Sequence, residues 1–506
     1  MTLCELVRVY GRELPCCVID DRPDFRRRGV YLDCSRGKVP TVDTLKALIE
    51  RLASWKINEL QLYFENVFKF ASHPKIGRGY SPYNASDILE IQEHCRKHHV
   101  RLVGSQATFG HLEKVLALKE YRHLGELAGF RGYPGGMTLC PGDPGSIALV
   151  RDMLGELTPL FDADDFNICG DEPWELGQGR SKRRVGRLGV GTVYLRFMDK
   201  VIGLCRKRGK RANIWADIVL AHPELLGELP RDITLLNWEY EASGPRIART
   251  AEIADTGLPF MVCPGTSSWL THGTRLKNAM TNVRSFASAG RKYGAEGLLN
   301  TDWGDYGHRN FLGVSLHGLA HGAAHAWCGT KVDEAAFTRR FCSHLFGEDS
   351  GKLADAIEQL GAVRDRVGCR LYYALIERGG AKDGEIAKID PDGADESIER
   401  LSVRGLWPAA PKELDSFERI ALKEMKLAGE MDLLACRRAM MIRDMQAGRN
   451  VGPTERRKLV RRLDLLPDKF EKLWMLRNRK SRLSDNLRLL KKAPNLPGVD
   501  KPATGA

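Results

Sequence analysis

The 506-residue sequence has no run of about 20 consecutive apolar residues, the length that a membrane-spanning helix needs. It also has no secretory signal at its N-terminal end, where a basic start is lacking and charged residues such as Glu5 and Arg8 interrupt every apolar stretch. We therefore expect no membrane association and a cytoplasmic location.

Several motifs of common enzyme classes are missing as well. The sequence contains no GxSxG elbow, no Walker loop and no CxxC pairs at zinc spacing. Its 13 cysteines are scattered from Cys4 to Cys436, which is typical of reduced and mostly buried thiols. The neighbouring pairs Cys16-Cys17 and His98-His99 are better explained by chance than by a metal. We expect neither a cofactor nor a bound metal.

The chain has instead a regular alternation of strand-like and helix-like segments up to about residue 326. Eight strand-like runs are each followed by a helical pattern, and they cover residues 29–35, 59–65, 100–107, 165–172, 211–218, 233–240, 259–266 and 295–305. A doubly wound open sheet is the competing arrangement, but it would need a Gly-rich phosphate turn after the first strand, where "SRGKVP" stands. The pattern predicts an α/β protein with a (β/α)8 TIM barrel.

The pattern changes after Thr330, where nearly every window has helical spacing. We predict an N-terminal extension (1–27), the barrel (28–330), a helical C-terminal domain (331–492) and a disordered tail (493–506). The polar, Gly-rich segment 379–397 is predicted to be a loop within the helical domain.

Basic residues are concentrated near the C-terminus. Fourteen of them stand against five acidic residues between Val451 and Lys492, within a chain of net charge +13. Such a segment could bind an anionic partner such as nucleic acid. Apolar residues at helical spacing, among them Leu459, Leu463 and Phe470, favour amphipathic helices with a solvated basic face instead.

Polar and aromatic residues recur where the predicted strands end, which is the edge of such a barrel that carries the active site. The candidate residues at this edge are Glu65, His111, Asp171, Glu172, Trp215, Trp238, Trp269, Trp303 and Asp305. Tryptophan rings suit the apolar faces of a sugar, and carboxylates suit its hydroxyl groups. The set predicts a carbohydrate pocket.

The adjacent acids Asp171 and Glu172 in "FNICGDEPWELG" favour a particular mechanism. One buried carboxylic acid with a raised pKa can protonate the leaving oxygen of a glycoside. Ordinary retaining and inverting glycosidases take their two carboxylates from separate places. A neighbouring pair fits substrate assistance better, in which the 2-acetamido oxygen of the sugar attacks the anomeric carbon and the second acid orients the acetamido group.

At these residues the sequence resembles family 20 glycoside hydrolases, the β-N-acetylhexosaminidases. The similar segments are "RGVYLDCSR" (28–36), "INELQLYFEN" (57–66), "YNASDILEIQEHCRKHHVRLVGSQATFGH" (83–111), "NICGDE" (167–172), "WAD" (215–217), "TDWGD" (301–305) and "LRNRKSRLSDN" (476–486). The resemblance implies that Arg28 binds sugar hydroxyls, that Asp171 orients the acetamido group and that Glu172 is the acid/base. The sequence departs from the family at Cys169, which replaces the first glycine of the GGDE signature. A second departure is the missing tyrosine near strand seven, for which Tyr306 or another group would have to substitute.

The resemblance implies a retaining exo-β-N-acetylhexosaminidase that removes terminal N-acetylglucosamine or N-acetylgalactosamine through an oxazolinium intermediate. Its partners would be N-acetylhexosamine-terminated glycans or glycoconjugates. A non-catalytic sugar-binding barrel and, less favoured, nucleic-acid binding remain the alternatives. The stripe His317, His321 and His325 has a spacing that zinc can use, but no carboxylate accompanies it in the sequence, so packing and hydrogen bonding are expected there. The sequence does not indicate an oligomeric state.

Overall fold

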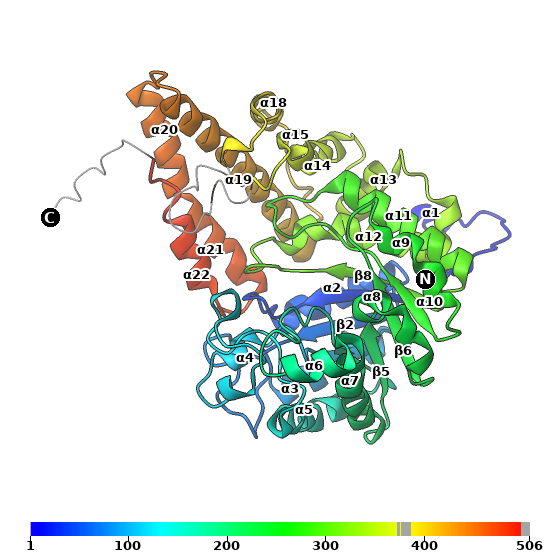
Figure 1. The fold of residues 1–506 in the computed structure, drawn as a ribbon. Helices are drawn as coiled ribbons and strands as arrows, with labels where there is room; N and C mark the ends of the chain where they lie inside the picture. The colour runs from blue at the N-terminus through cyan, green and yellow to red at the C-terminus, as the bar shows by residue number, and fades with distance from the viewer. Residues whose placement is uncertain (1, 372–374, 376–385, 497–506) are drawn as a thin grey trace.

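The centre of the molecule is a closed barrel of parallel strands that follow one another in chain order (Figure 1). The computed structural model describes residues 2–371, 375 and 386–496. The barrel strands are β1 (Arg27–Asp33), β2 (Glu59–Phe64), β3 (Arg101–Gln106), β4 (Asp165–Cys169), β5 (Arg211–Trp215), β6 (Ile233–Trp238), β7 (Phe260–Cys263) and β8 (Gly297–Asp302). The predicted α/β class and the eight-stranded TIM barrel are confirmed, because each predicted run contains its strand or overlaps most of it.

Helices surround the barrel and cover its strands (Figure 1). They are α2 (Val42–Ser54), α3 (Ala85–Lys97), α5 (Pro144–Leu157), α7 (Val190–Arg206), α8 (Asp217–Ala221), α9 (Pro245–Ala248), α10 (Thr250–Ala254), α11 (Leu276–Tyr293) and α12 (Leu312–Cys328). The short helices α4 (Glu113–Leu116) and α6 (Lys182–Leu188) lie in the loops after β3 and β4, and α1 (Thr2–Tyr10) precedes the barrel. The strands are buried along nearly their whole length, as expected for parallel strands covered by helices.

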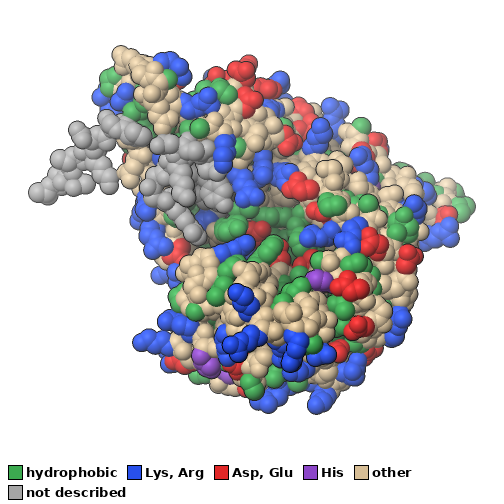
Figure 2. Space-filling model, in the orientation of Figure 1, with side chains coloured by type: hydrophobic (Ala, Val, Ile, Leu, Met, Phe, Trp, Pro, Cys, Tyr) green, Lys and Arg blue, Asp and Glu red, His purple; other side chains and the backbone are tan. Residues whose placement is uncertain are grey.

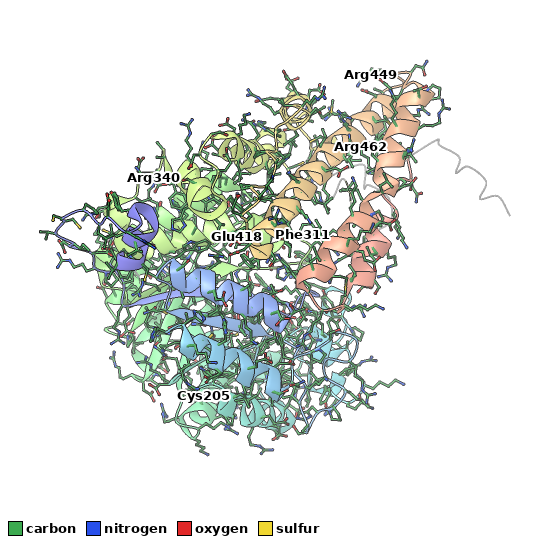
Figure 3. The ribbon with its side chains drawn as sticks, turned by 180° about the vertical axis from the view of Figure 1, so that it is seen from behind. Cys205, Phe311, Arg340, Glu418, Arg449 and Arg462 are labelled. Atoms are coloured by element: carbon green, nitrogen blue, oxygen red, sulfur yellow. The ribbon has the colours of Figure 1, made fainter. Side chains whose placement is uncertain are left out.

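The remainder of the described chain is helical and packs against the barrel from one side (Figures 1 and 3). Its helices are α13 (Phe337–Phe346), α14 (Lys352–Gly361), α15 (Val363–Val367), α18 (Pro391–Leu401), α19 (Ser416–Gln446), α20 (Pro453–Asp464), α21 (Leu466–Arg477) and α22 (Leu483–Leu490). The long helix α19 packs along α12. An ion pair joins Arg51 of α2 to Glu418 of α19, and the Phe311 and Phe470 ring centroids lie 5.0 Å apart. No helix among the described residues is long and apolar enough to span a bilayer.

Three of the predicted segment boundaries can be compared with the described structure. Phe341, Leu353 and Ala428 belong to the same buried hydrophobic cluster as the barrel core, so the division at residue 330 remains a prediction. The predicted loop 379–397 is wrong for its last residues, since α18 begins at Pro391 and is capped by Asp390. Of the predicted disordered tail, residues 493–496 pack against the C-terminal helices, whereas 497–506 lie outside the described residues.

A buried network of ion pairs links several strands at the amino end of the barrel. Arg27 of β1 donates from Nε and Nη2 to both carboxylate oxygens of Glu59 on β2, at 2.9 and 3.0 Å. Its Nη2 also lies 3.5 Å from the Asp165 carboxylate on β4, which Arg211 binds at 2.7 Å from β5. Arg27, Glu59 and Asp165 are each less than 3% exposed, so each charge depends on the others for compensation.

We predict that Arg27→Met destabilises the fold by about 3–5 kcal/mol, because the buried Glu59 carboxylate loses the arginine that binds both of its oxygens, and Asp165 loses one of its cations. The measurement is the urea midpoint of unfolding. The matched control is Arg206→Met, which removes an exposed partner of Asp232 and should cost about 0–1 kcal/mol. Equal midpoints for the two variants would contradict the structural role of the network.

Candidate active site

A cavity of about 910 Å³ lies at the carboxyl ends of the barrel strands. Its inner wall contains Arg36, His111, Glu172 and Asp305, which follow β1, β3, β4 and β8. The cavity therefore lies at the end of the barrel where the sequence predicts the active site. Its size is near the upper end of the range for sites that hold small molecules.

Asp171 and Glu172 share one cationic neighbour at the end of β4. His111 Nε2 lies 3.2 Å from Oδ2 of Asp171 and 3.5 Å from Oε2 of Glu172. Burial alone would lower the pKa of His111, but the adjacent Asp171 carboxylate raises it to about 9. The pKa of Glu172 is raised, mainly by burial, with His111 opposing and Asp171 adding to the shift. The site thus places a glutamic acid of raised pKa beside a histidine of raised pKa.

The backbone at the end of β4 is bent to present these acids. The register of β4 against β5 shifts between Asn167 and Cys169, and Cys169 and Glu172 have positive φ values of 58° and 47°. Gly170, with φ 90°, completes the turn. A Cβ at Gly110 would lie 2.5 Å from the Asp171 carbonyl oxygen, so the loop after β3 also presses against the pair. The unusual cysteine occupies a position whose φ suits glycine.

Asp217 is a third acid in this group; it belongs to the strand-end segment "WAD" (215–217) but was not among the predicted site residues. Its carboxylate accepts from the Glu172 backbone N–H and from Nε1 of Trp238, both at 3.3 Å. Burial and the neighbouring Asp171 raise the pKa of Asp217 to about 7. Its position two residues after Trp215, at a strand end, was the available signal.

Arg28 does not join this group, and the expectation for it is wrong. It is the second residue of β1 and therefore lies at the amino end of the barrel. Its guanidinium donates to the carbonyl groups of Phe25, Arg26 and Lys56, and it lies over the Trp327 ring at 5.0 Å. The arginine at the cavity is Arg36, beyond the other end of the strand.

Arg36 connects carboxylates from three strand ends. Nη1 lies 3.0 Å from Asp33 and 3.2 Å from Asp305, and Nε lies 3.3 Å from Glu65. Lys114 binds the other oxygen of Glu65 at 2.5 Å. Glu65 is thus fully buried beneath the cavity, while Asp305 reaches its wall.

The four predicted tryptophans lie on one rim, but two of them are buried. Trp215 and Trp303 are 1% and 6% exposed and pack against Tyr31, whereas Trp238 and Trp269 are partly exposed. The sequence analysis missed Tyr240, which links the set: its ring stacks on Trp238 at 5.0 Å and contacts Trp269 edge-on at 5.2 Å. Its hydroxyl accepts from Nε1 of Trp303 at 2.8 Å. Its position just after β6, two residues beyond Trp238, could have identified it as a residue of the same rim.

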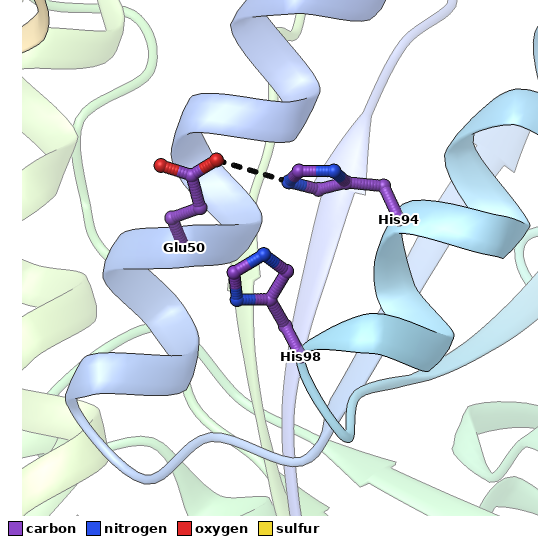
Figure 4. A group of neighbouring side chains, drawn as sticks. All are labelled: Glu50, His94 and His98. Atoms are coloured by element: carbon purple, nitrogen blue, oxygen red, sulfur yellow. Dashed lines mark ion pairs between the residues drawn. The ribbon is translucent and has the colours of Figure 1, made fainter.

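Among the described residues, two groups of side chains have the composition of a metal site, one beside α2 and α3 and the other formed by α12 and the turn before α13. In one, Glu50 of α2 lies 3.1 Å from Nε2 of His94, and His98 stands one turn further along α3 (Figure 4). In the other, His321 and His325 of α12 contact the two oxygens of Glu334 at 3.0 and 2.7 Å. The histidines of the stripe hydrogen-bond as expected, but the expectation that no carboxylate accompanies them is wrong. Carboxylate and imidazole are ligands that zinc accepts.

A (β/α)8 barrel that gathers carboxylates around a cavity at its carboxyl rim has the fold and the type of site found in glycoside hydrolases. The sequence matches the family described as "Glycosyl hydrolase family 20, catalytic domain" over residues 25–325. The chain therefore belongs to glycosyl hydrolase family 20, and its catalytic domain is that of a glycoside hydrolase.

Curated relatives and solved structures agree with this assignment. The chain is similar to hexosaminidase D of Homo sapiens (27% identity, 43% of this chain and 46% of the relative) and of Bos taurus (28%, 42% and 63%). The matched region is thus less than two thirds of either relative. The fold is similar to that of a Vibrio harveyi GH20 exo β-N-acetylglucosaminidase (TM-score 0.51, 18% identity, 64% of this chain and 57% of that chain). It is also similar to a Bacteroides fragilis β-N-acetylhexosaminidase (0.52, 16%, 65% and 72%).

We predict that the imidazole of His111 titrates near pH 9 in the folded protein and that Asp171→Asn lowers this pKa below its usual value near 6.5, because burial then acts without the carboxylate. NMR of isotope-labelled histidine measures both values. Since the folded-state pKa exceeds the unfolded one, protonated His111 stabilises the fold fully below about pH 6.5, and this contribution is lost as the pH rises through about 9. A wild-type pKa at or below 6.5 would refute the charged pair.

Proposed function

We propose that this protein is a retaining exo-β-N-acetylhexosaminidase that removes terminal N-acetylglucosamine or N-acetylgalactosamine by substrate-assisted catalysis. The observation that carries the proposal is the Asp171–Glu172 pair beside His111 in a family 20 barrel, with Glu172 and His111 at the wall of the cavity. The hexosaminidase names of the relatives support the same reaction class.

Glu172 is the proposed acid/base. Its raised pKa keeps a proton available for the glycosidic oxygen, and it is partly exposed to the cavity, where the leaving group must lie. As the bond to the leaving group breaks, the acetamido oxygen bonds to the anomeric carbon and an oxazolinium ion forms. Glu172, now ionised, then takes a proton from a water molecule. The water oxygen attacks the anomeric carbon and opens the oxazolinium ring, so the configuration at that carbon is retained.

Asp171 is the proposed orienting residue for the acetamido N–H. It does not need to form a bond to the sugar, and its contact with Nε2 of His111 at 3.2 Å holds the carboxylate in place. Tyr240 is the best candidate for the group that donates to the acetamido oxygen. Its hydroxyl accepts from Trp303 and retains its own proton for donation. Tyr306 is 59% exposed at the cavity rim, a poorer position for holding a small acyl group.

A direct displacement by a second enzyme carboxylate is less well supported. Asp217 is the nearest additional acid, but its pKa near 7 leaves much of it protonated at neutral pH, and its oxygens already accept from Glu172 and Trp238. Asp305 also has a raised pKa, mainly through burial, and is bound by Arg36. A nucleophile needs an ionised carboxylate that is free to approach the sugar, whereas Asp217 is partly protonated and Asp305 is engaged by Arg36.

Glu172→Gln should reduce kcat by about 10²–10⁴-fold, because the amide cannot donate or accept the proton. The assay uses p-nitrophenyl N-acetyl-β-glucosaminide and its galacto epimer. Glu228→Gln changes an exposed glutamate and should be unaffected. If the wild type cleaves neither glycoside yet binds N-acetylglucosamine, the non-catalytic sugar-binding alternative holds instead.

Asp171→Asn should reduce kcat on the order of 10²-fold, since the acetamido group is no longer held for attack. A thiazoline that mimics the oxazolinium ion should inhibit the wild type strongly and this variant much less. Asp199→Asn, an exposed change on α7, is the control. Equal inhibition of both proteins by the thiazoline would argue against acetamido participation.

A further inference from the structure

The outer part of the cavity is built by the C-terminal end of the described chain. Asp485, Asn486, Arg488 and Leu489 of α22, with Lys492 just beyond it, line the cavity opposite the barrel loops. These residues lie outside the 25–325 region that matches the family. The barrel therefore supplies the acids, and a separate segment supplies a wall beyond them.

The segment before α22 is fixed to the barrel next to the active site. The backbone N–H groups of Arg479 and Arg482 donate to the carbonyls of Val39 and Gly37, in the loop that follows β1. The Arg479 guanidinium also binds Asp87 at 2.9 Å and lies over the Tyr83 ring at 4.6 Å. Because Gly37 directly follows Arg36, the wall is held at a set position relative to the acids.

The outer cavity is strongly basic. Its lining includes five cationic side chains beyond the inner acid network, contributed by Arg131, Arg309, Arg482, Arg488 and Lys492. The one acidic residue on the α22 side of this lining is Asp485, which Arg482 and Arg488 bind at 2.5 and 3.0 Å. Figure 2 shows Lys and Arg side chains gathered around the hollow on this face. A cleft with charge of one sign concentrates ligands of the opposite sign.

Aromatic side chains accompany these cations. Trp174 and Tyr306 line the cavity although they are 45% and 59% exposed, and Tyr80 lies on the same rim beneath the Arg482 guanidinium at 5.2 Å. Arg131 lies 5.1 Å from the Trp174 ring. Exposed rings can stack on sugar faces, while arginines pair with carboxylate or sulfate groups.

We propose that the outer cavity binds an anionic aglycone: a glycan whose sugar next to the cleaved N-acetylhexosamine carries a carboxylate or a sulfate ester. This inference rests on the proposed function and names its substrate class. The inner cations Arg36 and Lys114 are balanced by several carboxylates of the barrel, whereas the five outer cations share the single carboxylate of Asp485, so the selection depends on the outer set.

The test uses disaccharides with an N-acetylhexosamine β-linked to glucuronic acid, to sulfated galactose or to neutral glucose. The wild type should cleave an anionic disaccharide with a kcat/KM about tenfold above the neutral one, and the preference should shrink from about 0.02 to about 0.5 M salt. The double variant R488Q/K492Q should lose most of this preference. The control R457Q/K458Q removes the same charge from exposed positions of α20, outside the cavity, and should keep the preference. Preference for the uronate or for the sulfate identifies the anionic group.

Calorimetric binding to Glu172→Gln protein separates this inference from the proposed function. Tighter binding of the anionic disaccharides, weakened by R488Q/K492Q, supports the inference even if the wild type hydrolyses none of them, which would overturn the proposed function alone. Equal binding of neutral and anionic disaccharides overturns the inference. Tighter binding of a single-stranded oligonucleotide, weakened by the same double variant, would also overturn it in favour of a nucleic-acid ligand.

Discussion

The arrangement of the active site depends on the pairing of Arg36 with carboxylates from three strand ends. Asp33, Glu65 and Asp305 converge at the carboxyl rim, where burial and mutual repulsion would otherwise favour their protonation or push them apart. The guanidinium also lies over the Trp303 ring at 4.9 Å, so the same cation connects the acids to the aromatic cluster. The cavity wall is thus stable because one planar cation satisfies several groups at once.

The acids around His111 form a second group, which Arg36 does not bind directly, and the pKa values in this group differ. His111 is held charged by Asp171, while burial raises the pKa of Glu172 and brings that of Asp217 to about 7. Acids placed within one small region thereby differ in their surroundings: Asp171 contacts a cation, while Glu172 and Asp217 have raised pKa values. The strained backbone at Glu172 is consistent with a position set by chemistry rather than by strand geometry.

The sequence predicted the barrel well because parallel strands buried on both faces form short apolar runs, and each run ends in polar residues at the same rim. The Asp171–Glu172 pair and His111 were found in this way. The interpretation of Arg28 failed because it followed the likeness to a motif, although the predicted strand 29–35 already placed Arg28 at the amino end, away from the active-site rim. The strand begins at Arg27, so the rim arginine is Arg36. Tyr240 was missed because nothing in its sequence separation from Trp303 indicates the hydrogen bond between them.

The basic C-terminal segment shows why net charge alone could not decide between a solvated face and a binding surface. Arg477 is buried and paired with Glu424, and Arg479 forms an ion pair with Asp87. These two arginines therefore hold the segment to the rest of the protein. Arg457 is exposed on α20, away from the cavity lining, whereas Arg488 reaches the cavity. The solvated basic face and the proposed binding surface therefore involve different residues of the same segment. Because the fixed part adjoins the loop after β1, the residues beyond it line the outer end of the cavity whose inner wall contains Glu172, and this is the position that our proposal assigns to the aglycone.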